Sequence, residues 1–148
     1  MGVKDKINIK GVVKVQLLSR DGKVVSERIL RNVVLANGAF DILYLIRGGP
    51  GSIFWNYVNI YDGGRTRVKT ITGSWGNVSD GAGYKYIVLT AEDSSTDEYS
   101  FRYFGLDATT RTLLEDNRLA YDYGTTGYKT SALILRVTWE IRISYGTI

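Results

Sequence analysis

The chain has no cysteine and no histidine, and proline occurs once in its 148 residues. Without cysteine it cannot form a disulfide, use a thiolate nucleophile or build most structural zinc sites. Without histidine it cannot form a Ser-His-Asp triad or use a histidine as general base. These absences exclude most hydrolase mechanisms. The sequence therefore predicts a protein that is not an enzyme and that holds no cofactor and no metal.

Carboxylate pairs remain possible with this composition, because two carboxylates suffice for glycoside hydrolysis. All the candidate acids fall in predicted loops or at strand ends, where solvated turn residues are the simpler interpretation. The candidates are Glu92, Asp93, Asp97, Glu98, Glu115 and Asp116.

Long apolar runs and blocks of charge are also missing. No run approaches the roughly 18 apolar residues of a membrane span, and the first residues lack the apolar segment of a signal peptide. We therefore expect a soluble chain with no membrane partner. The net charge of +4 comes from basic residues that are spread along the chain. A basic nucleic-acid-binding barrel is kept as the second alternative, although a nucleic-acid partner is not the expectation.

Strand-forming sequence, by contrast, is abundant. Residues 131–145 alternate between apolar and polar side chains, with one lapse at Ile134, over a length that is unusual for a single strand. Residues 7–17 alternate in the same way, and Asp21-Gly22 predicts a hairpin with a type I′ turn. The chain should return through residues 24–35, whose apolar side chains on both parities indicate burial on two sides or a bulge.

One helix is predicted over residues 39–47, with Asn37 as its N-cap and Asp41 in its first turn. This helix is apolar around most of its circumference, so we expect it to plug one open end of the sheet structure. Shorter strands follow, separated by turns rich in glycine and serine. Residues 119–130 are expected to form a polar loop that carries tyrosines.

The predicted elements, seven or eight strands and one short helix without linker or repeat, favour a single domain over residues 1–148. The expected fold class is all-β, as a β-sandwich or jelly-roll-like domain, and a small β-barrel is the alternative.

The 11 tyrosines and three tryptophans exceed what one small core needs. Aromatic and arginine side chains anchor protein contacts because they bury a large area at a low cost in conformational entropy. Aromatic rings also stack on sugars, so a carbohydrate-binding β-sandwich module, with a glycan as partner, is the first alternative function. We predict an interaction surface that includes Trp55, Tyr57, Tyr61, Arg65, Arg67, Trp75, Tyr121, Tyr123, Tyr128, Arg136 and Arg142.

The arginines of this set come from two predicted strands. Arg65 and Arg67 share one strand face with Lys69, where they are placed to meet phosphate or an acidic partner. Arg136 and Arg142 alternate with Glu140 on the polar face of residues 131–145. Alternating signs on one face suit ion pairs across strands or contact with a neighbouring subunit.

Two stretches resemble small β-rich virion structural proteins of tailed phages and similar viruses. Residues 31–46 (RNVVLANGAFDILYLI) are similar to the strand, Asn-x-Val, glycine and short Leu-rich helix that open tail-fibre and collar-type proteins. Residues 104–114 (FGLDATTRTLL) are similar to the Gly-Leu-Asp and Leu-Leu turn of those proteins, and residues 137–141 (VTWEI) to their terminal strand.

The resemblance implies a non-enzymatic structural protein on the outside of a virus particle, either a capsid decoration or cement protein or a fibre, spike or tail component. Such a protein binds and reinforces the capsid or tail, so its implied partner is the major capsid or tail protein. The resemblance also implies a homo-oligomer, commonly a trimer, and localisation in the virion after assembly in the host cytoplasm.

Overall fold

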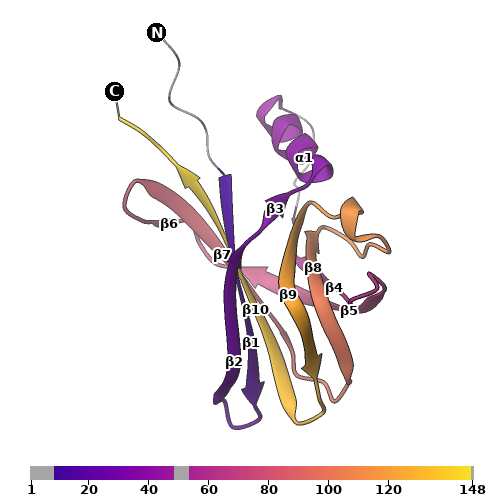
Figure 1. Cartoon of the computed structure of the whole chain (residues 1–148). Helices are drawn as coiled ribbons and strands as arrows, with labels where there is room; N and C mark the ends of the chain where they lie inside the picture. Colours follow the sequence, from indigo (N-terminus) through magenta and orange to yellow (C-terminus); the bar gives the residue numbers. More distant parts are fainter. Residues whose placement is uncertain (1–8, 49–53, 148) are drawn as a thin grey trace.

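The computed structural model describes residues 9–48 and 54–147. Figure 1 shows the strands arranged as two facing layers, with the single helix standing beyond one end of them. The elements in chain order are β1 (Ile9–Ser19), β2 (Val24–Arg31), β3 (Val33–Val34), α1 (Ala36–Ile46), β4 (Tyr57–Tyr61), β5 (Arg67–Trp75), β6 (Ser79–Asp80), β7 (Tyr84–Asp93), β8 (Tyr99–Asp107), the 3-10 turn η1 (Leu114–Asp116), β9 (Leu119–Lys129) and β10 (Leu133–Ser144).

The strands form an antiparallel sheet in the order β2-β1-β10-β7-β5-β4-β8-β9-β3, and β6 pairs with β7 outside this order. Only Asn32 separates β2 from β3, yet β2 pairs with β1 whereas β3 pairs with β9. The two ends of the sheet therefore meet at Asn32, and the sheet nearly closes on itself. This architecture confirms the predicted all-β class, a sandwich or barrel with one short helix.

β10 lies between β1 and β7, so it joins the beginning of the chain to its end. Its odd positions face the core, where Leu135 and Trp139 are fully buried. Trp139 stands opposite Val13 on β1 and Leu89 on β7, and both of these side chains are fully buried as well. The alternation in residues 131–145 thus predicted the strand and also its buried side.

The hairpin between β1 and β2 is where it was predicted, but its turn differs. Gly22 has a φ of 91°, and no other residue of this turn has a positive φ. The N–H of Gly22 donates to the carbonyl of Ser19 at 2.9 Å, and the N–H of Ser19 donates to the carbonyl of Lys23 at 2.8 Å. A type I′ turn needs positive φ at both central residues, so this is a type I turn followed by a glycine bulge.

Residues 119–130 were expected to form a polar loop, but all of them except Thr130 form strand β9, which pairs with β8. Tyr121 and Tyr123 pack against Phe104 and Phe101, with ring centroids 6.0 and 5.2 Å apart. The period-two pattern is present in the sequence, but the glycines and the aspartate between the tyrosines have low strand propensity. Pairing with β8 and the aromatic contacts outweigh that propensity.

Replacing Leu135 by Ala should lower the free energy of unfolding by about 2–5 kcal/mol, because the Leu135 side chain of β10 is fully buried in the core. Urea unfolding followed by tryptophan fluorescence measures the loss. Ile143→Ala is the matched control on the same strand, since Ile143 is 47% exposed and should change stability by about 0.5 kcal/mol or less. Equal losses in the two variants would contradict the position assigned to the core.

Candidate interaction surface

Large apolar side chains are exposed along one continuous part of the chain, from β2 through α1. Within the described residues, fifteen large hydrophobic side chains are exposed, and nine of them lie between residues 24 and 46. A monomeric protein rarely exposes a large apolar patch without an interaction that covers it. We call these nine residues the exposed apolar segment: Val24, Val25, Ile29, Leu30, Val33, Phe40, Leu43, Leu45 and Ile46.

The β2 part of this segment contradicts the burial expected for residues 24–35. β2 pairs with β1 along one edge, and the side chains of its two faces are mostly exposed. β2 lies at the end of the sheet order, so few other elements cover it. Apolar residues on both parities were interpreted as burial on two sides or as a bulge. The register between β1 and β2 does shift next to Leu17 and Leu18, but the folded chain leaves the apolar side chains of β2 at its surface.

α1 is attached to the sheet through polar and small residues. The buried carboxylate of Asp41 accepts hydrogen bonds from Arg118 Nε at 2.7 Å and from Trp55 Nε1 at 3.2 Å. Arg118 also pairs with the fully buried Asp107, at 3.3 Å. At Gly38 a Cβ atom would lie 2.2 Å from the carbonyl oxygen of Arg118, so only glycine lets the helix approach this closely.

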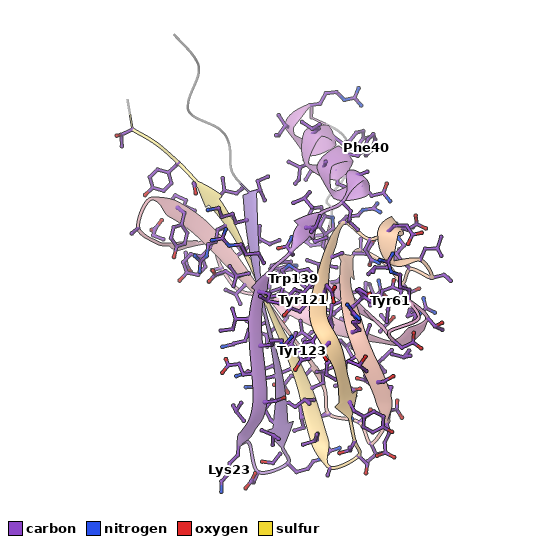
Figure 2. The ribbon with its side chains drawn as sticks, viewed as in Figure 1. Lys23, Phe40, Tyr61, Tyr121, Tyr123 and Trp139 are labelled. Atoms are coloured by element: carbon purple, nitrogen blue, oxygen red, sulfur yellow. The ribbon has the colours of Figure 1, made fainter. Side chains whose placement is uncertain are left out.

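The apolar side of α1 faces away from this attachment. Phe40, Leu43 and Ile46 are 64%, 66% and 73% exposed, and their spacing of three residues places them near one another on the helix. Figure 2 shows Phe40 on the helix, well apart from the core side chain Trp139. No helix in the described part of the chain is both long and apolar enough to cross a lipid bilayer.

Three expectations for the helix need correction. It begins at Ala36, and its N-cap is Leu35, whereas the Asn37 side chain donates to the carbonyl of Asp116 at 3.0 Å. Asp41 lies in the middle of the helix as its anchor. The helix also does not fill the end of the sheet structure. Its inner side borders an apolar cavity of about 420 Å³, which is lined by Ile9, Ile42, Leu45, Phe54, Trp55, Trp75, Ile87, Leu119, Ile141 and Ile143.

A groove of about 860 Å³ lies beside the exposed apolar segment, where β2 and β9 approach each other. Arg28 of β2 spans this seam, because its Nη1 donates to the carbonyl of Tyr123 at 2.6 Å and its guanidinium lies 5.0 Å from the centre of the Tyr123 ring. The groove is mostly apolar, with charged residues among its lining. It is lined by Val12, Ile29, Leu30, Arg31, Val33, Leu35, Arg65, Tyr103, Leu114, Glu115, Ala120, Tyr121 and Asp122.

Three residues that the sequence placed on the interaction surface are buried in the core. Tyr61 is fully buried and its hydroxyl donates to the carbonyl of Arg111 at 2.6 Å. Tyr121 and Tyr123 are buried against β8, as described above. Burial raises the pKa of the Tyr61 and Tyr121 hydroxyls, that of Tyr121 to about 12. These tyrosines were assigned to the surface because β9 was not recognised as a strand and because the number of aromatic residues does not reveal which ones the core uses.

The other aromatic candidates are partly or largely exposed. Trp55, Tyr57 and Trp75 are half-buried. The two tryptophans are held internally, because Trp75 Nε1 donates to the carbonyl of Trp55 at 3.0 Å and Trp55 Nε1 donates to Asp41. Tyr128 is exposed. Within the predicted set, Tyr128 is therefore the aromatic side chain that offers most of its surface to a partner.

The predicted basic residues are dispersed. Arg65 lies in the turn before β5, with a φ of 63°, and its guanidinium is 5.1 Å from the ring centre of Tyr103. Arg67 is exposed at the first position of β5, and Lys69 pairs with Asp97 at 2.6 Å. The predicted row of three basic residues on one strand face therefore does not form.

The arginines of β10 have acidic partners within the chain. Arg136 forms an ion pair at 2.5 Å with Glu92, the residue opposite it on β7. Arg142 pairs with Glu140 of its own strand and lies 4.8 Å from the ring centre of Tyr84. Arg136 thus forms an ion pair across strands, which was one of the two interpretations of this pattern, whereas Arg142 and Glu140 pair along their own strand.

The sequence-based set omitted the residues that are most exposed and apolar in the fold, namely the exposed apolar segment. The signal for it was present, since α1 is apolar on most sides and β2 is apolar on both parities. The helix pattern was interpreted as burial within the chain, and the β2 pattern as burial on two sides or a bulge. A sequence pattern shows that an apolar surface exists, but it does not show whether the chain itself covers that surface.

A buried ionic cluster lies at the loop that joins β7 to β8. Asp93 accepts hydrogen bonds from the Tyr99 hydroxyl at 2.6 Å and from the Ser95 N–H at 2.9 Å, and Lys69 Nζ is 3.9 Å away. Burial disfavours its charge, but these hydrogen bonds and Lys69 outweigh burial and hold the pKa of Asp93 below its ordinary value of 3.8. The cluster orders this loop.

Fully buried Lys129 belongs to the same end of the molecule. Its Nζ donates to the carbonyls of Ser95 and Asp97 at 2.7 and 2.8 Å. Burial lowers the pKa of this ammonium group. Within residues 9–48 and 54–147, no group of three or more acidic residues is arranged to hold a metal ion.

No protein-family model, curated protein or solved structure matches this chain. The interaction surface is therefore assigned on physical grounds.

Replacing Asp41 by Asn should loosen α1, because the amide removes the charge that pairs with the half-buried Arg118. We expect the free energy of unfolding to fall by about 1–3 kcal/mol and backbone hydrogen exchange to accelerate in α1 more than in β10. Exchange measured by mass spectrometry tests this, with the exposed Asp116 replaced by Asn as control. Unchanged exchange in α1 would show that the Asp41–Arg118 pair does not hold the helix.

Replacing Asp93 by Asn should destabilise the protein at neutral pH and much less in acid. A carboxylate whose pKa is lower in the folded state stabilises the fold above its unfolded-state pKa, and this contribution is lost as the pH falls through the folded-state pKa. The difference in unfolding free energy between the two proteins should therefore shrink below about pH 4. Urea unfolding at several pH values measures it. Asp80→Asn, in an exposed ion pair with Lys85, should show little difference at any pH.

Proposed function

We propose that this chain is a non-enzymatic structural protein on the outside of a virus particle, which binds and reinforces the capsid or the tail. The observation that carries the proposal is the exposed apolar side of α1, formed by Phe40, Leu43 and Ile46. α1 belongs to residues 31–46, the first of the two stretches that resemble virion proteins. The residues of the resemblance and the exposed surface therefore coincide.

The energetics support a partner that covers this helix. Full burial of a large apolar side chain contributes about 1.5–3 kcal/mol, and these three side chains are each about two-thirds exposed. Covering them should therefore contribute roughly 1–2 kcal/mol each. The polar attachment through Asp41 and Arg118 keeps this side turned outward, because the anchor holds the opposite side of the helix to the sheet.

The buried polar groups support a structural interpretation as well. Asp107 is bound by both Arg111 and Arg118, at 2.9 and 3.3 Å. Asn117 donates to the Tyr61 hydroxyl at 2.8 Å and accepts from the Asn59 side chain at 2.9 Å. These groups satisfy one another inside the fold, as groups that stabilise a rigid module do.

The two alternative functions lose part of the residues on which they rest. A carbohydrate-binding module needs exposed rings, and Tyr61, Tyr121 and Tyr123 belong to the core. A nucleic-acid-binding surface needs free cations, and Lys69 is paired with Asp97. The apolar side of α1 is a contact surface for protein, so the proposal of a capsid or tail partner uses the feature that both alternatives leave unexplained.

The proposal predicts that the chain purifies with virus particles and that Leu43→Glu abolishes this association. A charge in the centre of the apolar side of α1 should reduce the amount bound to particles at least about tenfold without lowering the melting temperature. Density-gradient purification followed by quantitative mass spectrometry measures the bound fraction.

Val78→Glu serves as the matched control, since Val78 is 68% exposed outside the exposed apolar segment and its replacement should leave binding unchanged. A purified protein that is strictly monomeric and never accompanies particles or binds a capsid or tail protein would overturn the proposal.

A further inference from the structure

An apolar cavity of about 420 Å³ lies between α1 and the end of the sheet. An unfilled space of this kind is unfavourable, because the atoms of its walls lose the contacts that a packed core provides. An engineered apolar cavity of about 150 Å³ already binds benzene. Small-molecule sites commonly have volumes of about 300–1,000 Å³ and mostly apolar linings. This cavity therefore has the size and the lining of a ligand site.

One wall of the cavity is a row of isoleucines on the inner face of three neighbouring strands. Ile9 of β1 stands opposite Ile143 of β10. Ile141 of β10 stands opposite Ile87 of β7. Residues two apart on a strand share a face, so Ile141 and Ile143 extend the buried face of β10 beyond Trp139. This wall is therefore apolar across all three strands.

α1 supplies the opposite wall through Ile42 and Leu45. The helix is fixed right beside Ile42, where Asp41 accepts hydrogen bonds from Arg118 and Trp55. Figure 1 shows that α1 and the end of β10 lie at the same end of the molecule. A helix that is fastened by buried polar groups is not free to pack down onto the isoleucines. The anchor therefore keeps the cavity open.

The lining offers no hydrogen bond to water. Among the ten lining residues that the structure describes, only Trp55 and Trp75 have a polar group in the side chain. Trp75 Nε1 donates to the carbonyl of Trp55 at 3.0 Å, and Trp55 Nε1 donates to Asp41 at 3.2 Å. Water in a cavity needs about two to four polar partners, so an apolar guest is favoured over water here.

The cavity lining is long in the direction of the strands. It reaches from Ile143 to Trp75, which pairs with Leu89, the residue opposite Trp139. Ile143 and Trp139 are four residues apart on β10, which corresponds to about 14 Å along the strand. A compact ring would occupy only part of that length, whereas an extended hydrocarbon chain follows it. The shape therefore favours a chain.

The mouth of the cavity is marked by the lining residues Leu45, Phe54 and Ile143, which are exposed. Lys85 of β7 stands opposite Ile143, and its ammonium group lies 2.6 Å from the carboxylate of Asp80. The charge of Lys85 is therefore already balanced. A polar head group at this mouth meets solvent, and its charge contributes little to binding.

We propose that this cavity binds one unbranched hydrocarbon chain, that of a free fatty acid or fatty alcohol, with the polar head at the mouth. The walls formed by the isoleucines and by α1 enclose the chain, and the two tryptophans contact it along their rings. The site lies on the inner side of α1, so it is separate from the outer side on which the proposed function rests.

A series of fatty acid salts from hexanoate to tetradecanoate tests the proposal by titration calorimetry. Binding should saturate at one chain per protein. Each added methylene should tighten it about fourfold, as the transfer free energy of a buried CH₂ requires. The gain should stop near dodecanoate, because a longer chain extends past the mouth. Absence of saturable binding, or several chains bound per protein, would overturn the proposal.

Filling the cavity should block the site. Ile87→Phe places a larger side chain in the wall and should weaken decanoate binding at least about tenfold without lowering the melting temperature. Ile42→Phe tests the same space from the helix, in case the first variant does not fold. Ile29→Phe is the matched control, since Ile29 lies on β2 and does not line this cavity. Folded cavity variants that bind like the control would contradict the proposed site.

Leu43→Glu separates the cavity from the exposed side of α1. Leu43 belongs to the outer side of the helix and does not line the cavity. Decanoate affinity should therefore stay within about twofold of the original value. Loss of binding in this variant would show that the chain lies on the exposed apolar segment, and the cavity would no longer be the site.

The head group and the source of the chain are tested with decanol and with vesicles of phosphatidylcholine. Decanol and decanoate should bind within about threefold of each other, because Lys85 is paired with Asp80. The protein should not float with the vesicles, since a site for one chain leaves the second chain of the lipid in water. Flotation that Ile87→Phe abolishes would identify a bilayer lipid and contradict the free amphiphile.

The two proposals fail separately. A chain that binds decanoate but never accompanies virus particles contradicts the proposed function and leaves the cavity site standing. A chain that purifies with particles but binds no fatty acid or alcohol contradicts the cavity site and leaves the proposed function standing.

Discussion

The pairing of β10 with both β1 and β7 is the interaction on which the rest of this structure depends. It places Trp139 between Val13 and Leu89, so residues from the beginning, middle and end of the chain meet in one core. Every other strand is positioned by pairing outward from these three, and the sheet nearly closes because the chain changes neighbours at Asn32. Burial of the odd-numbered side chains of β10 stabilises this arrangement, while Arg136 and Glu92 pair on its other face.

A second constraint sets the surface. α1 is fastened by a carboxylate, Asp41, and by the absence of a side chain at Gly38, and the apolar residues of the helix are not used for its attachment. β2 likewise pairs with β1 along one edge and leaves most of its side chains exposed. In α1 and β2, polar groups make the internal contacts and apolar groups lie at the surface, which is the reverse of the usual distribution. This suits a module that folds without its partner and presents an apolar surface for the partner to cover.

Much of the fold follows from local patterns. Strict alternation identified β1 and β10 with their buried sides, and turn residues placed most of the shorter strands. β9 escaped recognition because Asp122, Gly124 and Gly127 have low strand propensity, and only pairing with β8 makes them part of a strand. The site was harder to predict, because an aromatic residue such as Tyr61 looks the same in the sequence whether it fills the core or faces a partner.

The sequence by itself determined the all-β class, the strands of strong alternation and the exclusion of cysteine and histidine chemistry, since these depend on residue type and period alone. Only the tertiary structure decided which apolar faces the chain covers. Val24–Arg31 and the helix that follows have the pattern of buried elements, yet they lie at a sheet edge and beyond the strand ends, where no other element of the described chain covers them. Periodicity shows that two sides of an element differ, whereas the position of that element in the fold decides whether its apolar side meets the core or a partner.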